Sequence, residues 1–144
     1  MATRTLRRLQ GITYWVINDR EEIRRFINSN IKKEWERDNQ KDGVDSRKDG
    51  WLLSLPKREW RTTVLGTSKA RLDPSMMSRE AFTTRLRQRS EELRRSISEY
   101  GVVIWPIVVR GEDCELRDGY CRLAALRSLG VSKVMAYVGS LQRS

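Results

Sequence analysis

The sequence contains no histidine, and it has only two cysteines and three prolines in 144 residues. Without an imidazole, the Ser-His triads, histidine acid–base chemistry and the usual zinc sites are all excluded. Two cysteines do not form the disulfide framework of a small secreted domain. Any catalysis must therefore use carboxylates, lysine, tyrosine, cysteine or a metal ion held by oxygen atoms.

Long apolar runs are also lacking. No stretch approaches the roughly 20 apolar residues that a membrane span requires. The N-terminal segment carries Arg4, Arg7 and Arg8 without an apolar region behind them, which is not the pattern of a signal peptide. We therefore expect an intracellular, cytoplasmic protein that has no membrane partner.

Positive charge is abundant. Lysine and arginine number 29 against 19 acidic residues, so the formal net charge is +10. A strongly basic protein is expected to meet a polyanion, and nucleic acid is the partner that we expect. The chain length and a hydrophobic fraction of 38% indicate one domain with a modest core.

The N-terminal third reads as a strand, a helix and a loop. Residues Ile12–Val16 alternate as a strand does, and Asn18 with Glu21 has the spacing of a capping box at a helix start. Apolar residues then follow at helical spacing as far as Trp35. From Asp38 to Gly50 the chain is polar and contains Lys-Asp-Gly twice, which predicts a loop. We divide the chain here, into an N-terminal segment of residues 1–50 and a core domain of residues 51–144.

The core domain combines strands with one long helix. Strands are expected at Trp60–Leu65 and Val134–Val138 and in the apolar runs Val102–Ile104 and Ile107–Val109. A long helix should start after an N-cap at Ser78 and run to Tyr100, with Gly101 as its stop and a break near Ser90. The predicted fold class is α/β (α+β), a small mixed β-sheet with flanking helices.

Two features favour contact with nucleic acid, and each has a plain structural alternative. Arg85, Arg87 and Arg89 lie in a stretch of the long helix without acidic neighbours, which suits a phosphate backbone. A solvated helix face explains them equally well. Trp51 and Trp60 lie near basic residues and would suit base stacking. They would equally fill a core or a homodimer contact.

The stretch from Ile107 to Gly130 organises the chain. It predicts a strand, a turn at Gly111–Asp113, a second strand and a helix that starts after Gly119. The free N–H groups of the first helical turn, with Arg122 beside them, form an anion site. The alternative is that Asp118 caps the helix and pairs with Arg122. Cys121 is either a reactive thiol at the helix start or a small buried residue.

The pattern Gly101-Val102, Pro106-Ile107-Val108-Val109-Arg110 and Asp118-Gly119-x-x-Arg122 resembles the core of the ParB/sulfiredoxin superfamily. The Asp-Gly-x-x-Arg form is most similar to the free-serine-kinase branch, and Arg71–Ser75 resembles the Arg-x-Asn-Pro box before the ParB core. Tyr120 stands where sulfiredoxins carry their catalytic cysteine, so we do not expect sulfiredoxin chemistry. A second phosphate motif and a downstream DNA-binding domain are missing, so we do not expect a partition clamp.

The resemblance implies a nucleotide ligand (ATP, ADP or CTP), with Mg²⁺ as a companion ion. Its phosphates would contact Gly119, Tyr120, Cys121 and Arg122, and its base and sugar would lie towards Pro106, Ile107 and Arg110. Asp118 would position a metal or water, and Glu80 would be a second catalytic acid, as the upstream glutamate of serine kinases is. We expect a DNA-associated protein that binds nucleotide or nucleic-acid phosphate, with hydrolase or nuclease activity left open. The alternatives are a small-molecule kinase and a non-catalytic interaction protein.

Overall fold

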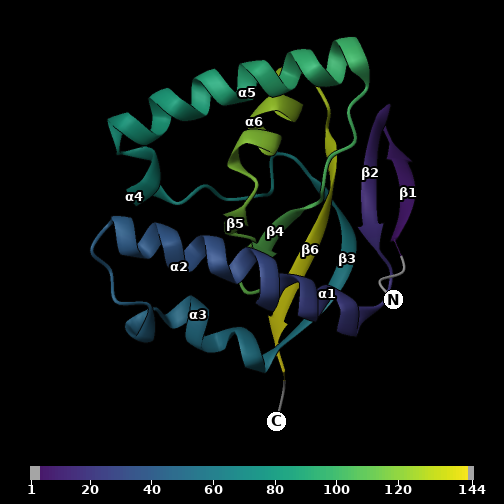
Figure 1. Cartoon of the computed structure of the whole chain (residues 1–144). Coiled ribbons are helices and arrows are strands. Elements are labelled where there is room, and N and C mark those ends of the chain that lie inside the picture. Colours follow the sequence, from purple (N-terminus) through teal and green to yellow (C-terminus); the bar gives the residue numbers. More distant parts are fainter. Residues whose placement is uncertain (1–3, 143–144) are drawn as a thin grey trace.

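The computed structural model of the chain describes residues 4–142 and is built on one four-stranded sheet (Figure 1). Its strand order is β3 (Arg58–Gly66), β6 (Lys133–Leu141), β4 (Ile107–Arg110) and β5 (Leu116–Asp118). Strands β6 and β4 are parallel, and the two outer pairs are antiparallel. This is the mixed sheet with flanking helices that the sequence predicts, so the fold class is confirmed.

Helices cover both faces of the sheet. On one face lie α5 (Glu80–Tyr100) and α6 (Tyr120–Ser128), which pack on Ile107 and Val109 of β4. On the other face lie α1 (Arg20–Phe26), the π-helical turn η1 (Ile27–Ile31), α2 (Lys32–Lys41) and α3 (Gly50–Ser54). Val108 points to this second face, so β4 is buried on both sides, as its unbroken apolar run predicts.

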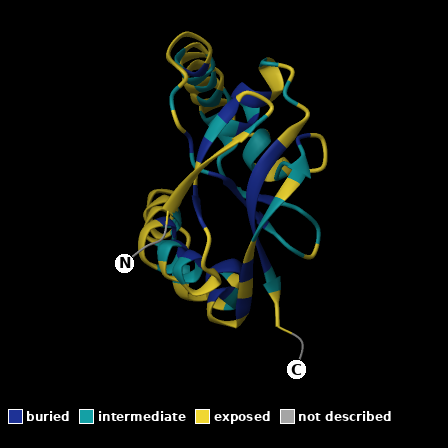
Figure 2. Ribbon diagram, turned by 90° about the vertical axis from the view of Figure 1, so that its right-hand side faces the viewer, coloured by how far each residue is buried: buried dark blue, intermediate teal, exposed yellow. Residues whose placement is uncertain are grey.

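Short elements complete the fold. They are the 3₁₀ turns η2 (Ser46–Lys48) and η3 (Leu55–Lys57) and the single helical turn α4 (Pro74–Met77). Figure 2 shows the strands of the sheet largely buried, with the exposed residues gathered on the outer sides of the helices and on the hairpin. Among residues 4–142, no helix is long and apolar enough to cross a bilayer.

A two-stranded hairpin, β1 (Arg4–Leu9) and β2 (Ile12–Ile17), lies beside the sheet. Tyr14 of β2 pairs with Ile104 and is buried in the same cluster as α6. The Ile17 N–H donates to the buried Tyr137 hydroxyl at 3.0 Å. Residues before position 50 therefore share both hydrophobic clusters with residues of the expected core domain.

Most predicted strands are confirmed, and one is wrong. Strands β2, β3, β4 and β6 contain the four segments Ile12–Val16, Trp60–Leu65, Ile107–Val109 and Val134–Val138. The run Val102–Ile104 is not a strand, because only Ile104 pairs and Val103 is 38% exposed. A run of apolar residues predicts burial and not strand pairing. Here Ile104 is buried because it packs along β2, and the segment does not join the four-stranded sheet.

The predicted helix boundaries need four corrections. Asp19, not Asn18, caps α1, since its carboxylate accepts from the Glu21 and Glu22 amides. Helix α2 continues to Lys41, beyond the predicted loop start. Helix α5 begins at Glu80 without a side-chain cap from Ser78. It also runs unbroken through Ser90, whose hydroxyl donates to the Arg87 carbonyl and so has a partner inside the helix.

The stacking role considered for Trp51 and Trp60 is wrong. Both are almost fully buried, at 5% and 2% exposure, and they meet edge to face with ring centroids 6.2 Å apart. Trp35 packs against Trp51 in the same manner. The tryptophans are therefore core residues beneath α2 and α3, which is the structural alternative given above.

Candidate functional site

The start of α6 lies where β5 ends and the backbone turns sharply at Gly119. Gly119 has φ +103°, and the Leu123 N–H is the first to bond back to it, through the Gly119 carbonyl. Among residues 4–142, no side chain accepts a hydrogen bond from the amides of Tyr120, Cys121 or Arg122. Because the Asp118 carboxylate binds Arg122 instead of capping the helix, these amides stay available to an anion.

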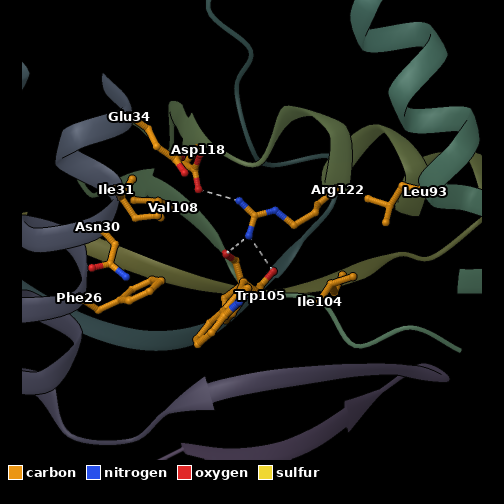
Figure 3. A pocket seen from close by; sticks show the side chains of 11 residues that line it. Phe26, Asn30, Ile31, Glu34, Leu93, Ile104, Trp105, Val108, Asp118 and Arg122 are labelled. Atoms are coloured by element: carbon orange, nitrogen blue, oxygen red, sulfur yellow. Dashed lines mark hydrogen bonds and ion pairs between the residues drawn. The ribbon is translucent and has the colours of Figure 1, made fainter. Parts of the chain in front are cut away.

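Arg122 is fixed beside these amides by contacts with the protein itself. Its Nη1 donates to the carbonyls of Trp105 and Pro106 at 3.1 and 3.0 Å, and its Nη2 donates to Asp118 Oδ2 at 2.6 Å (Figure 3). A guanidinium has five N–H groups, so Nε and one Nη2 hydrogen remain for a ligand. The ion pair between Asp118 and Arg122 that the alternative interpretation predicts is thus present, whereas the predicted cap is absent.

Gly119 lets that guanidinium lie against the backbone. A Cβ at this position would lie 2.8 Å from Ile107 Cγ2, 2.9 Å from Arg122 Nη2 and 3.1 Å from Arg122 Nε. The edge of the guanidinium that keeps unused hydrogens is therefore the edge next to the start of α6. Backbone donors and a fixed cation converge on one place.

Two hollows meet at Asp118 and Arg122. The first, of about 410 Å³, is largely apolar and is lined by Phe26, Ile31, Leu93, Ile104, Trp105, Pro106 and Val108, with Asn30 and Glu34 as further polar groups. Phe26 stacks on Trp105 with ring centroids 4.9 Å apart and forms part of its wall. Figure 3 shows the Arg122 guanidinium between this wall and Asp118. The hollow combines apolar walls with a few polar groups, as small-molecule sites do.

The second hollow, of about 440 Å³, has many more charged residues in its lining than the first, and we call it the polar hollow; it includes the start of α6. Its lining brings together Gly119, Tyr120, Cys121 and Arg122 with residues of α2 and α4. Its carboxylates outnumber its three arginines, and they are Glu34, Asp38, Asp42, Asp49, Asp73 and Asp118. A bare polyanion would be repelled here, whereas an anion that carries its own cation would not.

Glu34 of α2 faces Asp118 across the boundary between the hollows (Figure 3). Burial, and next the neighbouring Asp118 charge, raise the pKa of the Glu34 carboxyl, with Asp38 adding to the effect. Two close carboxylates of this kind mark functional sites more often than ordinary surfaces. The sequence interpretation missed Glu34, although Phe26, Asn30 and Glu34 follow one another at spacings of four and could have been recognised as one helix face.

The helix that presents Glu34 is irregular at this point. The Lys32 N–H bonds to the Ile27 carbonyl, five residues back, so one residue more than in an α-helical turn is accommodated at η1. Ile27 and Ile31 are buried on the sheet, while Asn30 lines the first hollow. Such turns often occur at functional sites, because they redirect side chains without ending the helix.

The structure brings some of the predicted site residues together and separates others. Gly119, Tyr120, Cys121, Arg122 and Asp118 line the polar hollow, and Pro106 lines the apolar one. Ile107 is fully buried under Gly119. Arg110 lies elsewhere and pairs with Asp113 and Glu115, which raises its pKa. Glu80 lines neither hollow.

The two remaining groups of predicted residues lie around the start of α6. Burial raises the pKa of the Cys121 thiol despite Arg89 and Arg122 nearby, which favours the interpretation as a small, part-buried residue. Arg85, Arg87 and Arg89 are exposed and form no ion pair within residues 4–142. Helical spacing puts Arg85 and Arg89 on the flank towards Cys121 and Arg87 on the other flank.

No group of three or more cysteines, aspartates and glutamates among residues 4–142 is arranged to hold a metal ion. The Glu34–Asp118 pair supplies two carboxylates. Mg²⁺ is commonly bound by one or two carboxylates together with substrate phosphates, so this donor set fits a nucleotide-bound Mg²⁺ rather than a metal cage made by the protein alone.

Comparison with known proteins gives a likeness in structure only. No protein-family model matches the chain, and no curated protein matches it. It is similar to two solved structures of the N-domain of a pNOB8-like ParB. The first has a TM-score of 0.45 and 22% identity, over 60% of this chain and 32% of that one. The second has a TM-score of 0.42 and 23% identity, over 58% and 28%. The chain thus spans about a third of their length.

Proposed function

We propose that this protein binds a nucleotide, as its Mg²⁺ complex, at the start of α6 and that it is a ParB-like, DNA-associated protein. The observation that supports this proposal is the meeting of an apolar and a polar hollow at the fixed Asp118–Arg122 pair, beside amides that no side chain of residues 4–142 caps. A nucleotide has the same two parts, an apolar base and a charged phosphate chain.

The two hollows divide the ligand between them. The phosphates bind the amides of Tyr120, Cys121 and Arg122 and the free edge of the Arg122 guanidinium. The base enters the apolar hollow between Phe26, Leu93 and Ile104. Pro106 also lines the apolar hollow and would lie beside the base. Ile107 is buried, so it would not touch the ligand and would only pack against Gly119.

The acid-rich lining of the polar hollow favours a metal complex over a bare phosphate. Glu34 and Asp118 would hold Mg²⁺ together with the phosphates, and the ion would neutralise charge during hydrolysis or phosphoryl transfer. Without a cation the two carboxylates repel each other, which is consistent with the raised pKa of Glu34. Mg²⁺ should therefore strengthen nucleotide binding.

Nucleic acid is assigned to the outside of the molecule rather than to the hollows. Arg85 and Arg89 on α5 are exposed and have no acidic partner in the part of the chain that the structure describes, and Arg89 lies near Cys121 at the start of α6. They suit a phosphate backbone, which needs charge without base contacts. A second candidate function, a small-molecule kinase, is favoured by Glu34, because a carboxyl with a raised pKa suits proton transfer from an acceptor hydroxyl.

Calorimetric titration with ATP, ADP and CTP, with and without Mg²⁺, tests the proposal. Arg122→Ala should weaken binding by about tenfold or more, because it removes charge-assisted hydrogen bonds to phosphate. Arg122→Lys keeps the positive charge but loses the planar guanidinium, so its nucleotide affinity should lie between those of Arg122→Ala and the parent. Since Arg122 also bonds two carbonyls, the fold of each variant is checked by its urea transition. A folded Arg122→Ala protein that binds nucleotide as the parent does would refute the site.

A further inference from the structure

A third hollow extends the site towards the hairpin. It has a volume of about 290 Å³ and is lined by Arg4 of β1, Glu22 and Arg25 of α1, and by Phe26 and Asn30 among others. Phe26 and Asn30 also line the apolar hollow, which in turn shares Glu34, Asp118 and Arg122 with the polar one. The three hollows therefore follow one another along the face of α1, η1 and α2.

Guanidinium groups lie at two places along this series. Arg122 lies where the polar and apolar hollows meet, and Arg4 and Arg25 lie in the third hollow, beyond the apolar one. The side chains of Arg4 and Arg25 are exposed. Glu22 lines the same hollow, so the net charge contributed by these three side chains is one positive unit. A second cationic position thus lies beyond the apolar hollow.

The separation of the two positions is set by one residue, Trp105. The Arg4 guanidinium carbon lies over its indole ring, 5.2 Å from the ring centroid, and Arg122 bonds its carbonyl at 3.1 Å. Both arginines also act on the buried Tyr137 hydroxyl, where each lowers a pKa that burial raises. Both cations therefore contact Trp105, which itself lines the apolar hollow.

We propose that the full ligand is a nucleoside with phosphoryl groups on both sides, one at the start of α6 and the other at Arg4 and Arg25. This deepens the proposed function and depends on it. A mononucleotide with all its phosphates on one side fills two hollows and leaves the third empty. A nucleoside 3′,5′-bisphosphate, or one nucleotide unit of a strand, fills all three. Asn30, at the junction of the second and third hollows, offers an amide to the base or sugar.

Titration with three matched probes tests this proposal. These are the 5′-monophosphate, the 5′-diphosphate and the 3′,5′-bisphosphate of adenosine and of cytidine, with Mg²⁺. The diphosphate carries as many phosphoryl groups as the bisphosphate, but on one side only. We expect the bisphosphate to bind about tenfold tighter than the monophosphate. Arg4→Ala/Arg25→Ala should abolish that gain and leave the affinities for monophosphate and diphosphate within a factor of about two.

The control variant is Arg7→Ala/Arg20→Ala, which removes the same charge from the same two elements. Arg7 points to the other side of β1 and Arg20 lines a different hollow, so all affinities should match the parent. A bisphosphate that binds no tighter than the monophosphate, or a gain that survives Arg4→Ala/Arg25→Ala, would overturn the second position. Failure of every probe to bind would instead refute the nucleotide site itself.

A 5′-phosphorylated dinucleotide identifies the source of the bisphosphate unit. Tighter binding than the free 3′,5′-bisphosphate assigns the site to the end of a nucleic-acid strand. Weaker binding, with the bisphosphate gain intact, assigns it to the free small molecule. Both outcomes support the second anion position, because both require a phosphoryl group at Arg4 and Arg25.

Discussion

Gly119 combines two requirements that a side chain would violate. Its φ of +103° is strained for other residues, and an added Cβ would meet Ile107 and Arg122 at 2.8 and 2.9 Å. Gly119→Ala should therefore lower the free energy of unfolding by about 2 kcal/mol or more and displace the guanidinium. Gly43→Ala is the control, since Gly43 also has positive φ but nothing lies within 4 Å of its Cβ position. Gly43→Ala should lower the free energy of unfolding by about 1 kcal/mol. If urea titrations show the same loss of unfolding free energy for both variants, the contacts with Ile107 and Arg122 are not the cause of the loss at Gly119.

Glu34 gives the protein a pH dependence with a defined sign. Its raised pKa means that the folded protein holds the proton more tightly than the unfolded chain does, so ionisation of Glu34 opposes folding. Its contribution to stability is greatest below the ordinary glutamate pKa of 4.5 and is lost as the pH rises through the raised pKa. Because Glu34 is also exposed to solvent, which weakens the effect, Glu34→Gln should melt at a slightly higher temperature than the parent at pH 7, and the difference should vanish in acid.

Glu36→Gln is the matched control for this comparison. Glu36 is exposed and lies on the opposite side of α2, away from Asp118. It should produce no such pH-dependent difference in melting temperature. A Glu34→Gln protein that is less stable than the parent at pH 7 would show that the carboxylate is satisfied by its surroundings.

Helix α5 divides its arginines between two flanks. Arg89 acts electrostatically on Cys121, and Arg85 is one turn away on the same flank. Arg85→Ala/Arg89→Ala should weaken binding to mixed-sequence duplex DNA and reduce the slope of log K against log salt by about two. Arg87→Ala/Arg95→Ala removes equal charge from positions off this flank, where Arg95 is paired with Glu91, and should leave the slope nearly unchanged. Equal effects of the two pairs would indicate a general effect of net charge.

Elements with a strong local signal could be predicted from the sequence. Alternating or continuous apolar residues marked β2, β3, β4 and β6, and Gly101 and Gly119 marked the end of α5 and the start of α6. The extension of α2 to Lys41 could not be predicted, because its residues are polar and it is held by contacts such as the bond from Asn39 Nδ2 to Asp49 Oδ2 at 2.8 Å.

The site could be predicted only where it is local in sequence. The run from Asp118 to Arg122 indicated an anion site, and its five residues do line one hollow. Asn30 and Glu34 reach the same place from the opposite face of the sheet, about ninety residues away in the chain. The sequence shows each as a polar residue on a mixed helix face. Only the tertiary structure shows which polar residues meet.

The whole chain should unfold as one unit despite the predicted division at residue 50. Ile17, Ile23 and Ile27 share a cluster with Trp60 and Tyr137, and the Ile17 amide bonds the Tyr137 hydroxyl. Tyr137→Phe leaves that buried amide without its acceptor and should cost about 1–2 kcal/mol. Urea transitions followed by far-UV circular dichroism and by tryptophan fluorescence should shift together.

Tyr100→Phe is the control for this variant, since Tyr100 is 78% exposed. It should leave both transitions where they are in the parent. Two separated transitions in the parent protein would show instead that residues 1–50 and 51–144 are independent domains.

The π-helical turn at Ile27–Ile31 sets the phase between the two halves of one long helix. Because this turn already holds one residue in excess, deleting a single residue there would restore an ordinary α-helical turn without rotating the helix beyond it. Glu34 would still face Asp118, and Trp35 would still bond to β5. The same deletion elsewhere in the helix would rotate everything beyond it by about 100°, so a loss of three nucleotides from the coding sequence is best tolerated at η1.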